Sequence, residues 1–233
     1  MYAFKGSKSK EEELAYSSIT PRELLERLAE SENAKTREGV ALNPNSGADA
    51  LEKLANDKNA GIVLLVAKNL NTSSKTLSLL AHHPDSVIRQ MVAVNPHTLN
   101  EDLEALSEDK EPWVRREVAK NPHISKKILE KLASDPRPEV REAAMYNENA
   151  TGEMLARGIR DNDANVRVAA ATNHNIEAEC LENALNDPCS RVMARAVKNP
   201  NVTKSIIEAA KSSEDPLVKR ALQESKYAKT YDV

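Results

Sequence analysis

The sequence predicts an all-α protein made of about eight stacked two-helix repeats, and three observations support this. Asparagine returns at a spacing of 26 residues along most of the 233-residue chain. Aliphatic residues return in the same frame, and a repeat of this length is typical of stacked supersecondary units. Aromatic residues make up only 3% of the chain, whereas a compact globular core is normally filled with large rings.

The most regular feature is the asparagine column, which ends where Ser225 takes its place. Proline follows the asparagine in four repeats and disfavours helix in the residue before it. We interpret each asparagine as the end of a second helix, where its amide satisfies loose backbone carbonyls or the next turn. The column consists of Asn43, Asn69, Asn95, Asn121, Asn147, Asn173 and Asn199.

Aliphatic columns keep the same frame and define eight repeats between residues 18 and 225. One column is Leu25, Leu51, Leu77, Leu103, Leu129, Leu155, Leu181 and Ile207. Another is Val40, Val66, Val92, Val118, Ala144, Ala170, Ala196 and Leu222. A further leucine column weakens to Gly158 in the sixth repeat, and because glycine disfavours helix, we expect the stack to bend or open most readily there.

Each repeat contains two predicted helices. The first is clearest in TPRELLERLAESE, where Thr20 is expected to cap the helix, Pro21 to begin it and Glu23 to complete a capping box. The second, as in PEVREAAMYN at 138–147, is expected to be shorter. A 26-residue unit cannot bury both faces by itself, so its stability must come from its neighbours. The predicted fold is therefore an α-solenoid.

The segments DPRPEVREAAMYN and EDKEPWVRREVAKNP resemble the leucine-rich repeat variant family and are similar to HEAT-type repeats. The resemblance covers about nine tenths of the chain. It implies a right-handed superhelix, short 3₁₀ segments in the second-helix layer and a role as a binding scaffold. Residues 1–17 contain no cysteine, so the cysteine-rich iron–sulfur segment of one family member is not expected. The 26-residue period leaves the choice between this family and HEAT-like packing open.

We expect three segments: an N-terminal arm or capping helix at 1–17, the solenoid at 18–225 and a tail at 226–233. The sequence contains no signal-peptide core and no run long enough to span a membrane. Its two cysteines, Cys180 and Cys189, provide no disulfide framework. These features predict a cytoplasmic protein, and a net charge of −3 requires neither a polyanion nor a membrane as partner.

Two rows of charged residues resemble a catalytic or phosphate-binding series. They pair Asp109 with Arg115, Asp135 with Arg141, and Asp161 with Arg167 at constant spacing, whereas Asp57 and Asp187 are expected to lack an arginine. A reaction needs one site, and this pattern is a graded series. We therefore interpret the rows as a structural ladder of ion pairs between successive repeats.

No catalytic residue, metal site or cofactor is predicted. His97 and His123 share a column with asparagines, which suggests a side-chain hydrogen bond near the start of the next first helix. Zinc would need three or four converging ligands, and His82 and His83 keep it only as a minor alternative. Cys180 occupies a position filled elsewhere by aliphatic residues. Because no phosphate loop or nucleophile motif occurs, we expect a protein that is not an enzyme.

Candidate binding residues lie eight, five and one positions before the column asparagine, on what we call the variable face of the second helices. The candidates are Trp113, Arg116, Lys120, Glu142, Tyr146 and Lys198. An exposed tryptophan beside arginine is typical of an interface hot spot, although Trp113 could instead pack locally.

The first functional hypothesis is therefore a scaffold that binds another protein through the variable face. The less favoured alternative is nucleic-acid binding, as in HEAT-like DNA glycosylases, with Trp113 and either Asp109 or Asp135 in suggestive positions. The variable face carries seven basic and four acidic residues, and this bias is too small to favour a nucleic acid over an acidic protein surface.

Overall fold

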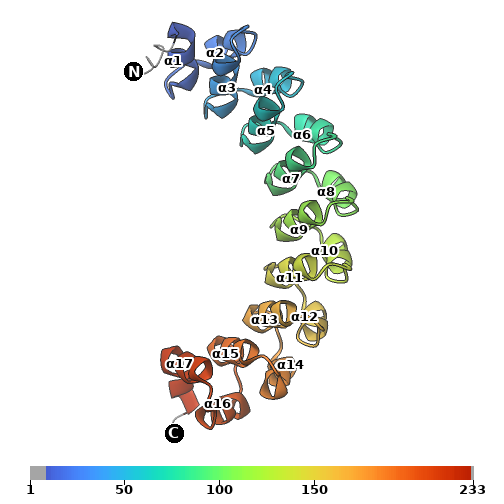
Figure 1. The fold of residues 1–233 in the computed structure, drawn as a ribbon, viewed down its shortest axis with the longest axis vertical. Coiled ribbons are helices and arrows are strands. Elements are labelled where there is room, and N and C mark those ends of the chain that lie inside the picture. The colour runs from blue at the N-terminus through green and yellow to red at the C-terminus, as the bar shows by residue number, and fades with distance from the viewer. Residues whose placement is uncertain (1–8, 232–233) are drawn as a thin grey trace, which may run out of the picture. The chain divides into compact units, whose positions relative to one another are not determined.

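The computed structural model describes residues 9–231, and within that range every regular element is a helix (Figure 1). Two helices make up each repeat, and second helices of successive repeats pack side by side within each part of the chain. This confirms the predicted helical-repeat fold. The chain divides after Leu106 into two units, which are described separately below.

The first unit contains a leading helix followed by alternating first and second helices. Their bounds are α1 Lys10–Tyr16, α2 Arg22–Leu28, α3 Ala34–Leu42, α4 Ala48–Leu54, α5 Ala60–Lys68, α6 Ser74–Leu80, α7 Ser86–Val94 and α8 Asn100–Leu106.

The second unit continues the alternation and includes two short 3₁₀ helices, η1 and η2. Its elements are α9 Pro112–Lys120, α10 Lys126–Leu132, α11 Pro138–Tyr146, α12 Gly152–Gly158, α13 Ala164–Thr172, α14 Ala178–Leu181, η1 Glu182–Asn186, α15 Ser190–Lys198, α16 Lys204–Lys211, α17 Pro216–Glu224 and η2 Ala228–Tyr231.

The expectation of a shorter second helix, partly 3₁₀, is wrong. Every second helix spans 9 residues, as in Ala34–Leu42, whereas a typical first helix spans 7, as in Arg22–Leu28. The last turn of the first helices tightens: the Glu30 N–H donates to the Arg27 carbonyl at 3.2 Å and the Ser31 N–H to the Leu28 carbonyl at 3.1 Å, each three residues back. The 3₁₀ turn also lies in the first-helix layer, at η1.

The helical irregularity lies in the seventh repeat. There α14 stops after 4 residues and η1 follows it directly. The Asn183 amide donates to the Cys180 carbonyl at 2.6 Å, and such local side-chain bonds compete with regular helix. The sixth repeat, in contrast, has a regular first helix of 7 residues.

Glycine at Gly158 is compensated by a larger neighbour. A Cβ at that position would lie 2.2 Å from the Met145 sulfur, so the methionine already occupies the volume that a leucine fills in other repeats. Met145 is 1% exposed, and the second-helix residue in its column is alanine in five other repeats. The packing therefore stays close in the sixth repeat despite the loss of the leucine.

The N-terminal helix α1 covers the first repeat. Ser9 and Glu12 form a capping box at its start, and α1 packs against α3 so closely that a Cβ on Gly39 would lie 2.8 Å from the Ala15 Cβ. Thr20 does not cap α2, because its buried hydroxyl donates to the Leu14 carbonyl. Residues 1–8 of the expected arm lie outside the described residues.

At the other end, the segment expected to be a tail is helical at Ala228–Tyr231. The Tyr231 hydroxyl donates to the Val202 carbonyl at 2.9 Å, which ties this segment to the last repeat. Residues 232 and 233 lie outside the described residues.

Within each unit, the asparagine column joins one repeat to the preceding one. The Asn147 amide donates to the Ala119 carbonyl at 2.8 Å and to the Asn121 carbonyl at 3.1 Å, both at the end of the previous second helix. Its Oδ1 accepts from the backbone N–H of Asn149 at 2.8 Å. The same amide pattern occurs at Asn43, Asn69, Asn95, Asn173 and Asn199.

A second polar column adds another bond between repeats. The Asn149 amide donates to the Pro122 carbonyl at 2.8 Å, and Asn201 donates to the His174 carbonyl at 2.9 Å. The bond therefore goes back to the turn of the preceding repeat. Asn175 and Asn201 donate a second bond to the carbonyls of Ala150 and Ile176, close to the starts of the first helices α12 and α14. The backbone carbonyls of that turn are the nearest free acceptors because the helix has already ended.

We predict that replacing Asn147 by alanine lowers the free energy of unfolding by about 2–3 kcal/mol, because two carbonyls lose their donor. Serine should cost less, since Ser225 fills this column with a hydroxyl that donates to the Val197 carbonyl. Urea unfolding monitored by circular dichroism measures both changes. Equal losses for the two variants would contradict the role of the donor.

A second prediction concerns Thr36, whose hydroxyl is fully buried and has no hydrogen-bond partner within residues 9–231. Its column is otherwise isoleucine or valine. Thr36→Val should raise the free energy of unfolding by about 1 kcal/mol, because it removes a buried polar group that has lost its water.

The matched control is Thr72→Val, since the Thr72 hydroxyl donates to the Val66 carbonyl at 2.6 Å. This control should be destabilised in the same thermal or urea unfolding measurement. Equal shifts in the two variants would show that the missing partner of Thr36 has no energetic effect.

Candidate functional site

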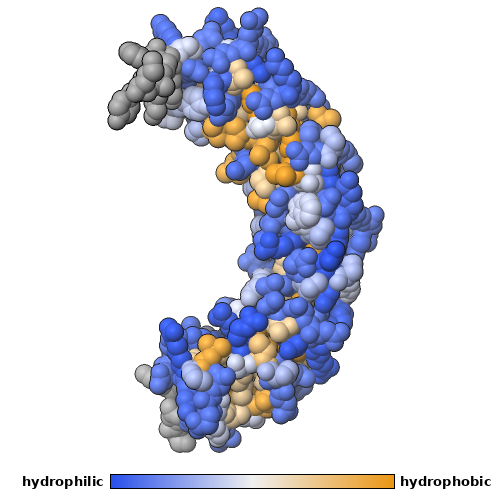
Figure 2. Space-filling model, viewed as in Figure 1, coloured by the Kyte–Doolittle hydropathy of each residue, from blue (hydrophilic) through white to orange (hydrophobic). Residues whose placement is uncertain are grey.

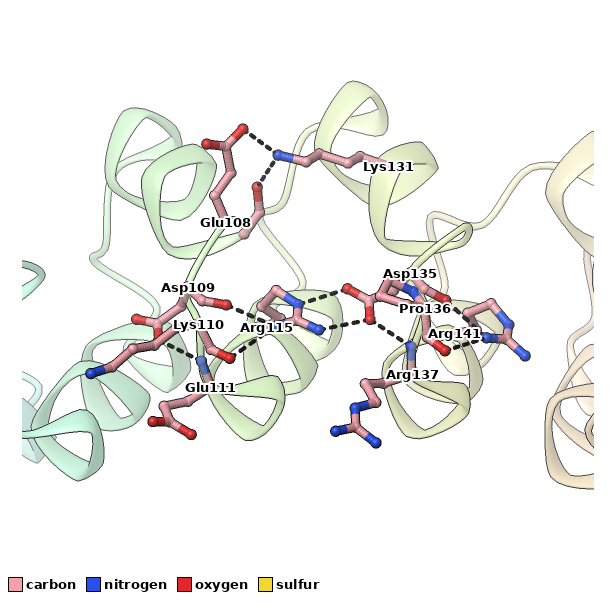
Figure 3. Close-up of polar contacts among 11 residues, drawn as sticks. Glu108, Asp109, Lys110, Glu111, Arg115, Lys131, Asp135, Pro136, Arg137 and Arg141 are labelled. Carbon is pink, nitrogen blue, oxygen red and sulfur yellow. Dashed lines mark hydrogen bonds and ion pairs between the residues drawn. The ribbon is translucent and has the colours of Figure 1, made fainter.

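The arginine and aspartate rows form ion pairs between successive repeats. Arg115 donates from Nε and Nη2 to the two carboxylate oxygens of Asp135, at 2.7 and 2.9 Å (Figure 3). The same two-pronged geometry joins Arg141 to Asp161 and Arg167 to Asp187. Each arginine therefore binds the aspartate of the following repeat, 20 residues ahead.

This register corrects the expectation that Asp57 and Asp187 lack an arginine. Asp57 accepts from Arg37 at 2.5 Å, and Asp187 accepts from Arg167 at 2.7 Å. The aspartate six residues before an arginine offers that arginine only its backbone carbonyl. Arg115 Nη1, for example, donates to the Asp109 carbonyl at 2.7 Å (Figure 3). Arg37 was missed because the first repeat has serine, Ser31, at the aspartate position of its own frame.

The hydrogen-bonding capacity of the ladder carboxylates is taken up by contacts within the protein. Asp161 accepts from Arg141 and also from the backbone N–H of Asp163 at 2.9 Å. Burial alone would raise the pKa of Asp161, but the hydrogen bonds from Arg141 and Asp163 and the charge of Arg141 outweigh it and lower that pKa. A carboxylate held ionised in this way is suited to fixing geometry.

The histidines and cysteines do not converge. Within residues 9–231, no group of three or more histidine, cysteine or acidic side chains is placed to hold a metal ion. His83 accepts through Nδ1 from the Asp85 N–H, and His97 is exposed. Cys180 and Cys189 are free and half-buried, so Cys180 is less enclosed than its aliphatic column suggested.

The residues of the variable face lie largely in solvent. Trp113 is 44% exposed and Tyr146 48% exposed, and Arg116, Lys120 and Lys198 are also exposed. Glu142 is half-buried. Trp113 therefore does not pack into the core.

A groove of about 380 Å³ lies on this face, across α11, α13, α15 and α17 of the second unit. Three of the six sequence candidates line it, namely Glu142, Tyr146 and Lys198, whereas Trp113, Arg116 and Lys120 lie outside it. A smaller hollow of about 290 Å³ lies on the other side of Tyr146 and is lined in part by His174 and Asn175. Tyr146 thus borders both depressions.

The groove combines an apolar floor with charged walls. Val168 and Ala194 are buried at its base, and Leu217 is 43% exposed beside them. These residues, together with Arg191, Arg195 and Arg220, were not among the sequence candidates. Val168 and Ala194 belong to the column five residues before the asparagine, where Arg116, Glu142 and Arg220 are charged. Their small or apolar side chains are the sequence signal that could have indicated the floor of the groove.

The charges of the groove are unevenly paired. Glu224 binds Lys198 at 2.5 Å and Arg220 at 2.7 Å, and these bonds lower the pKa of Glu224 to about 2. Arg191 donates only to the neutral amide of Asn165, at 3.1 Å. Arg195 is exposed and lies within ion-pair distance of no carboxylate in residues 9–231. The groove therefore retains two arginines that no carboxylate neutralises.

The fold has known counterparts. A leucine-rich repeat variant with a novel repetitive structural motif aligns with a TM-score of 0.64 and 23% identity, over 87% of this chain and 81% of that one. The chain has the fold of a leucine-rich repeat variant. The Escherichia coli protein YibA aligns with a TM-score of 0.53 and 17% identity, over 94% of this chain and 98% of that one.

Searches against protein-family models and curated proteins give no match. No helix in residues 9–231 is both long and apolar enough to cross a bilayer. The leucine-rich repeat variant fold is therefore the firm result of the comparisons.

The ladder gives a prediction on pH dependence. Because the pKa of Asp161 is lowered by folding, its contribution to stability is complete above the unfolded aspartate pKa of about 3.9 and is lost as the pH falls through the lower folded value. Asp161→Asn should therefore destabilise the protein by about 2 kcal/mol at pH 7.

The difference between wild type and Asp161→Asn should shrink steadily below about pH 4. Urea unfolding from pH 7 to pH 2.5 measures it. Asp49→Asn serves as control, because Asp49 is exposed and makes no hydrogen bond through its side chain within residues 9–231. A constant difference across this pH range would contradict the linkage to Asp161.

Proposed function

We propose that this chain is a non-enzymatic scaffold that binds a segment of another protein along the second helices α11, α13, α15 and α17. The observation that supports this best is the coincidence of the groove with the variable face. Most of the stacking comes from the buried columns and from the ladders on other faces of the same helices, so exposed side chains such as Tyr146 and Arg195 are available to a partner.

The groove offers the mixture of groups that protein interfaces use. Tyr146 is an exposed aromatic residue on a rigid helix, and buried aromatic and arginine anchors dominate the energetics of interfaces. Arg191 and Arg195 extend from α15 without carboxylate partners. They favour a partner segment that carries aspartate or glutamate, because arginine binds carboxylates with two parallel hydrogen bonds.

A nucleic acid suits this groove less well. The groove places the carboxylates of Glu142 and Glu224 beside its four cations, and Glu224 already binds Lys198 and Arg220. A phosphate backbone needs a row of free cations and is repelled by carboxylates. The ladder aspartates Asp109 and Asp135 are occupied in backbone or ion-pair contacts, which argues against the role of a catalytic acid.

Affinity capture from cells that produce the protein tests the proposal. Wild type, Tyr146→Ala and Arg195→Glu are captured in parallel and compared by quantitative mass spectrometry. The proteins enriched by wild type should fall at least tenfold with each variant, as expected when a hot-spot side chain worth about 2 kcal/mol is lost. Lys126→Glu, an exposed charge reversal on the first helix α10, should leave them unchanged.

Two further arms separate the alternatives. The first is a double variant, Trp113→Ala with Arg116→Ala. If the partner lies along α9, this variant abolishes capture while Tyr146→Ala does not, and that result would contradict a site at Tyr146. A labelled duplex DNA should show no change in fluorescence anisotropy at low salt. Binding of the duplex that weakens steeply with salt would favour the nucleic-acid alternative.

A further inference from the structure

The variable face has a different character in the first unit. On α3, α5 and α7 it includes exposed aliphatic side chains beside a few polar ones, and Leu42, Val87 and Val94 are 49%, 46% and 49% exposed. Leu70, which follows the column asparagine where proline is usual, is 64% exposed. Figure 2 shows hydrophobic residues gathered over these three helices. Leu64, Leu65 and Met91 lie half-buried among them.

Folding does not require apolar residues at these positions. The repeats of the second unit provide an internal comparison, because the same columns there hold residues such as Trp113, Arg116 and Lys120 while the helices stack in the same way. The column that does hold the stack together, which includes Val40 and Val66, is fully buried in both units except at its last member, Leu222. Contiguous exposed apolar surface that serves no internal packing marks an interaction site.

The surface is hollowed between α3 and α5. A depression of about 470 Å³ is lined by residues that include Leu42, Pro44, Leu65 and Leu70. Its dimensions suit side chains inserted from a partner, because recognition grooves combine an apolar lining with a few polar groups. Asn71 on its wall is already engaged, since its amide donates to the Pro44 carbonyl at 2.6 Å.

A single cation lines this depression. Lys68 is exposed at the end of α5, and no carboxylate within residues 9–231 lies at ion-pair distance from its ammonium group. Lys35, on the same face, is instead paired with Glu38 at 2.6 Å. An ammonium group among aliphatic side chains favours an occupant that brings its own carboxylate, because the pair is less screened beside apolar surface than in open water.

We propose that the α3, α5 and α7 face is a second docking surface, which binds a segment of a partner protein that presents two or more large apolar side chains and one acidic side chain. The apolar side chains enter the depression between Leu42, Leu65 and Leu70. The carboxylate pairs with Lys68. This surface is separate from the groove at Tyr146, and it is tested by different substitutions.

The test begins with a random peptide library displayed against the immobilised full chain. Peptides that bind should be enriched in leucine, isoleucine, phenylalanine or methionine together with aspartate or glutamate. The strongest binder is then labelled and titrated by fluorescence anisotropy. Leu42→Lys combined with Leu70→Glu should weaken its binding at least tenfold, whereas Tyr146→Ala should leave the affinity unchanged.

The substituted residues are ones that the chain itself uses in the same columns, at Lys120 and Glu148. The variants should therefore fold, and an unchanged circular dichroism spectrum and melting temperature verify this. Lys68→Glu should weaken binding of the acidic peptide about tenfold. The same variant should regain affinity for a peptide in which the acidic residue is replaced by lysine.

Several results would overturn the proposal. Binders without apolar residues, binders without an acidic residue or the absence of any binder would each do so. Binding that is lost in Tyr146→Ala but kept in the Leu42→Lys, Leu70→Glu variant would place peptides in the groove of the second unit and leave that function intact. Self-association that the same double variant abolishes in sedimentation velocity would show that a second copy covers this face.

Discussion

The structure depends on a buried amide that reaches from one repeat to the end of the helix before it. A helix leaves its last carbonyls without intrahelical donors, and a stack of short helices multiplies such ends. The Asn69 amide donates to the Ala41 carbonyl at 2.9 Å, and the Asn95 amide donates to the Ala67 carbonyl at 2.9 Å. Within each unit, a repeat therefore satisfies the polar groups of its predecessor and cannot be replaced by an unrelated helix pair.

Because of this constraint, the different faces of the second helix make different contacts. One face packs its aliphatic columns, its C-terminal end carries the amide bonds, and the arginine beside the packed face holds the next repeat by a two-pronged ion pair. The exposed side chains of the remaining face contribute less to the stacking, so their identity is free to vary. That freedom explains how the same columns become charged around Arg195 in one unit and aliphatic around Leu65 in the other.

Packing in a stack is also corrected locally, between neighbouring repeats. Met145 fills the space that Gly158 leaves, although the two residues belong to consecutive repeats. Close packing favours such paired changes of volume, because a void or an overlap in a dense core is costly. An irregular residue in one column can thus be compensated by a residue in the neighbouring repeat, and it does not by itself mark a weakly packed part of the stack.

The sequence by itself determined the period, the buried columns and the helical-repeat fold, because burial in a regular stack repeats with the chain. Only the tertiary structure decided which repeat each arginine binds, since a constant spacing is the same for a partner six residues behind and one 20 residues ahead. It also decided the helix lengths, which depend on how each last turn bonds. The groove forms only when stacking brings Tyr146, Arg195 and Leu217 together from separate helices. Local sequence patterns do not reveal that these three residues lie close to one another.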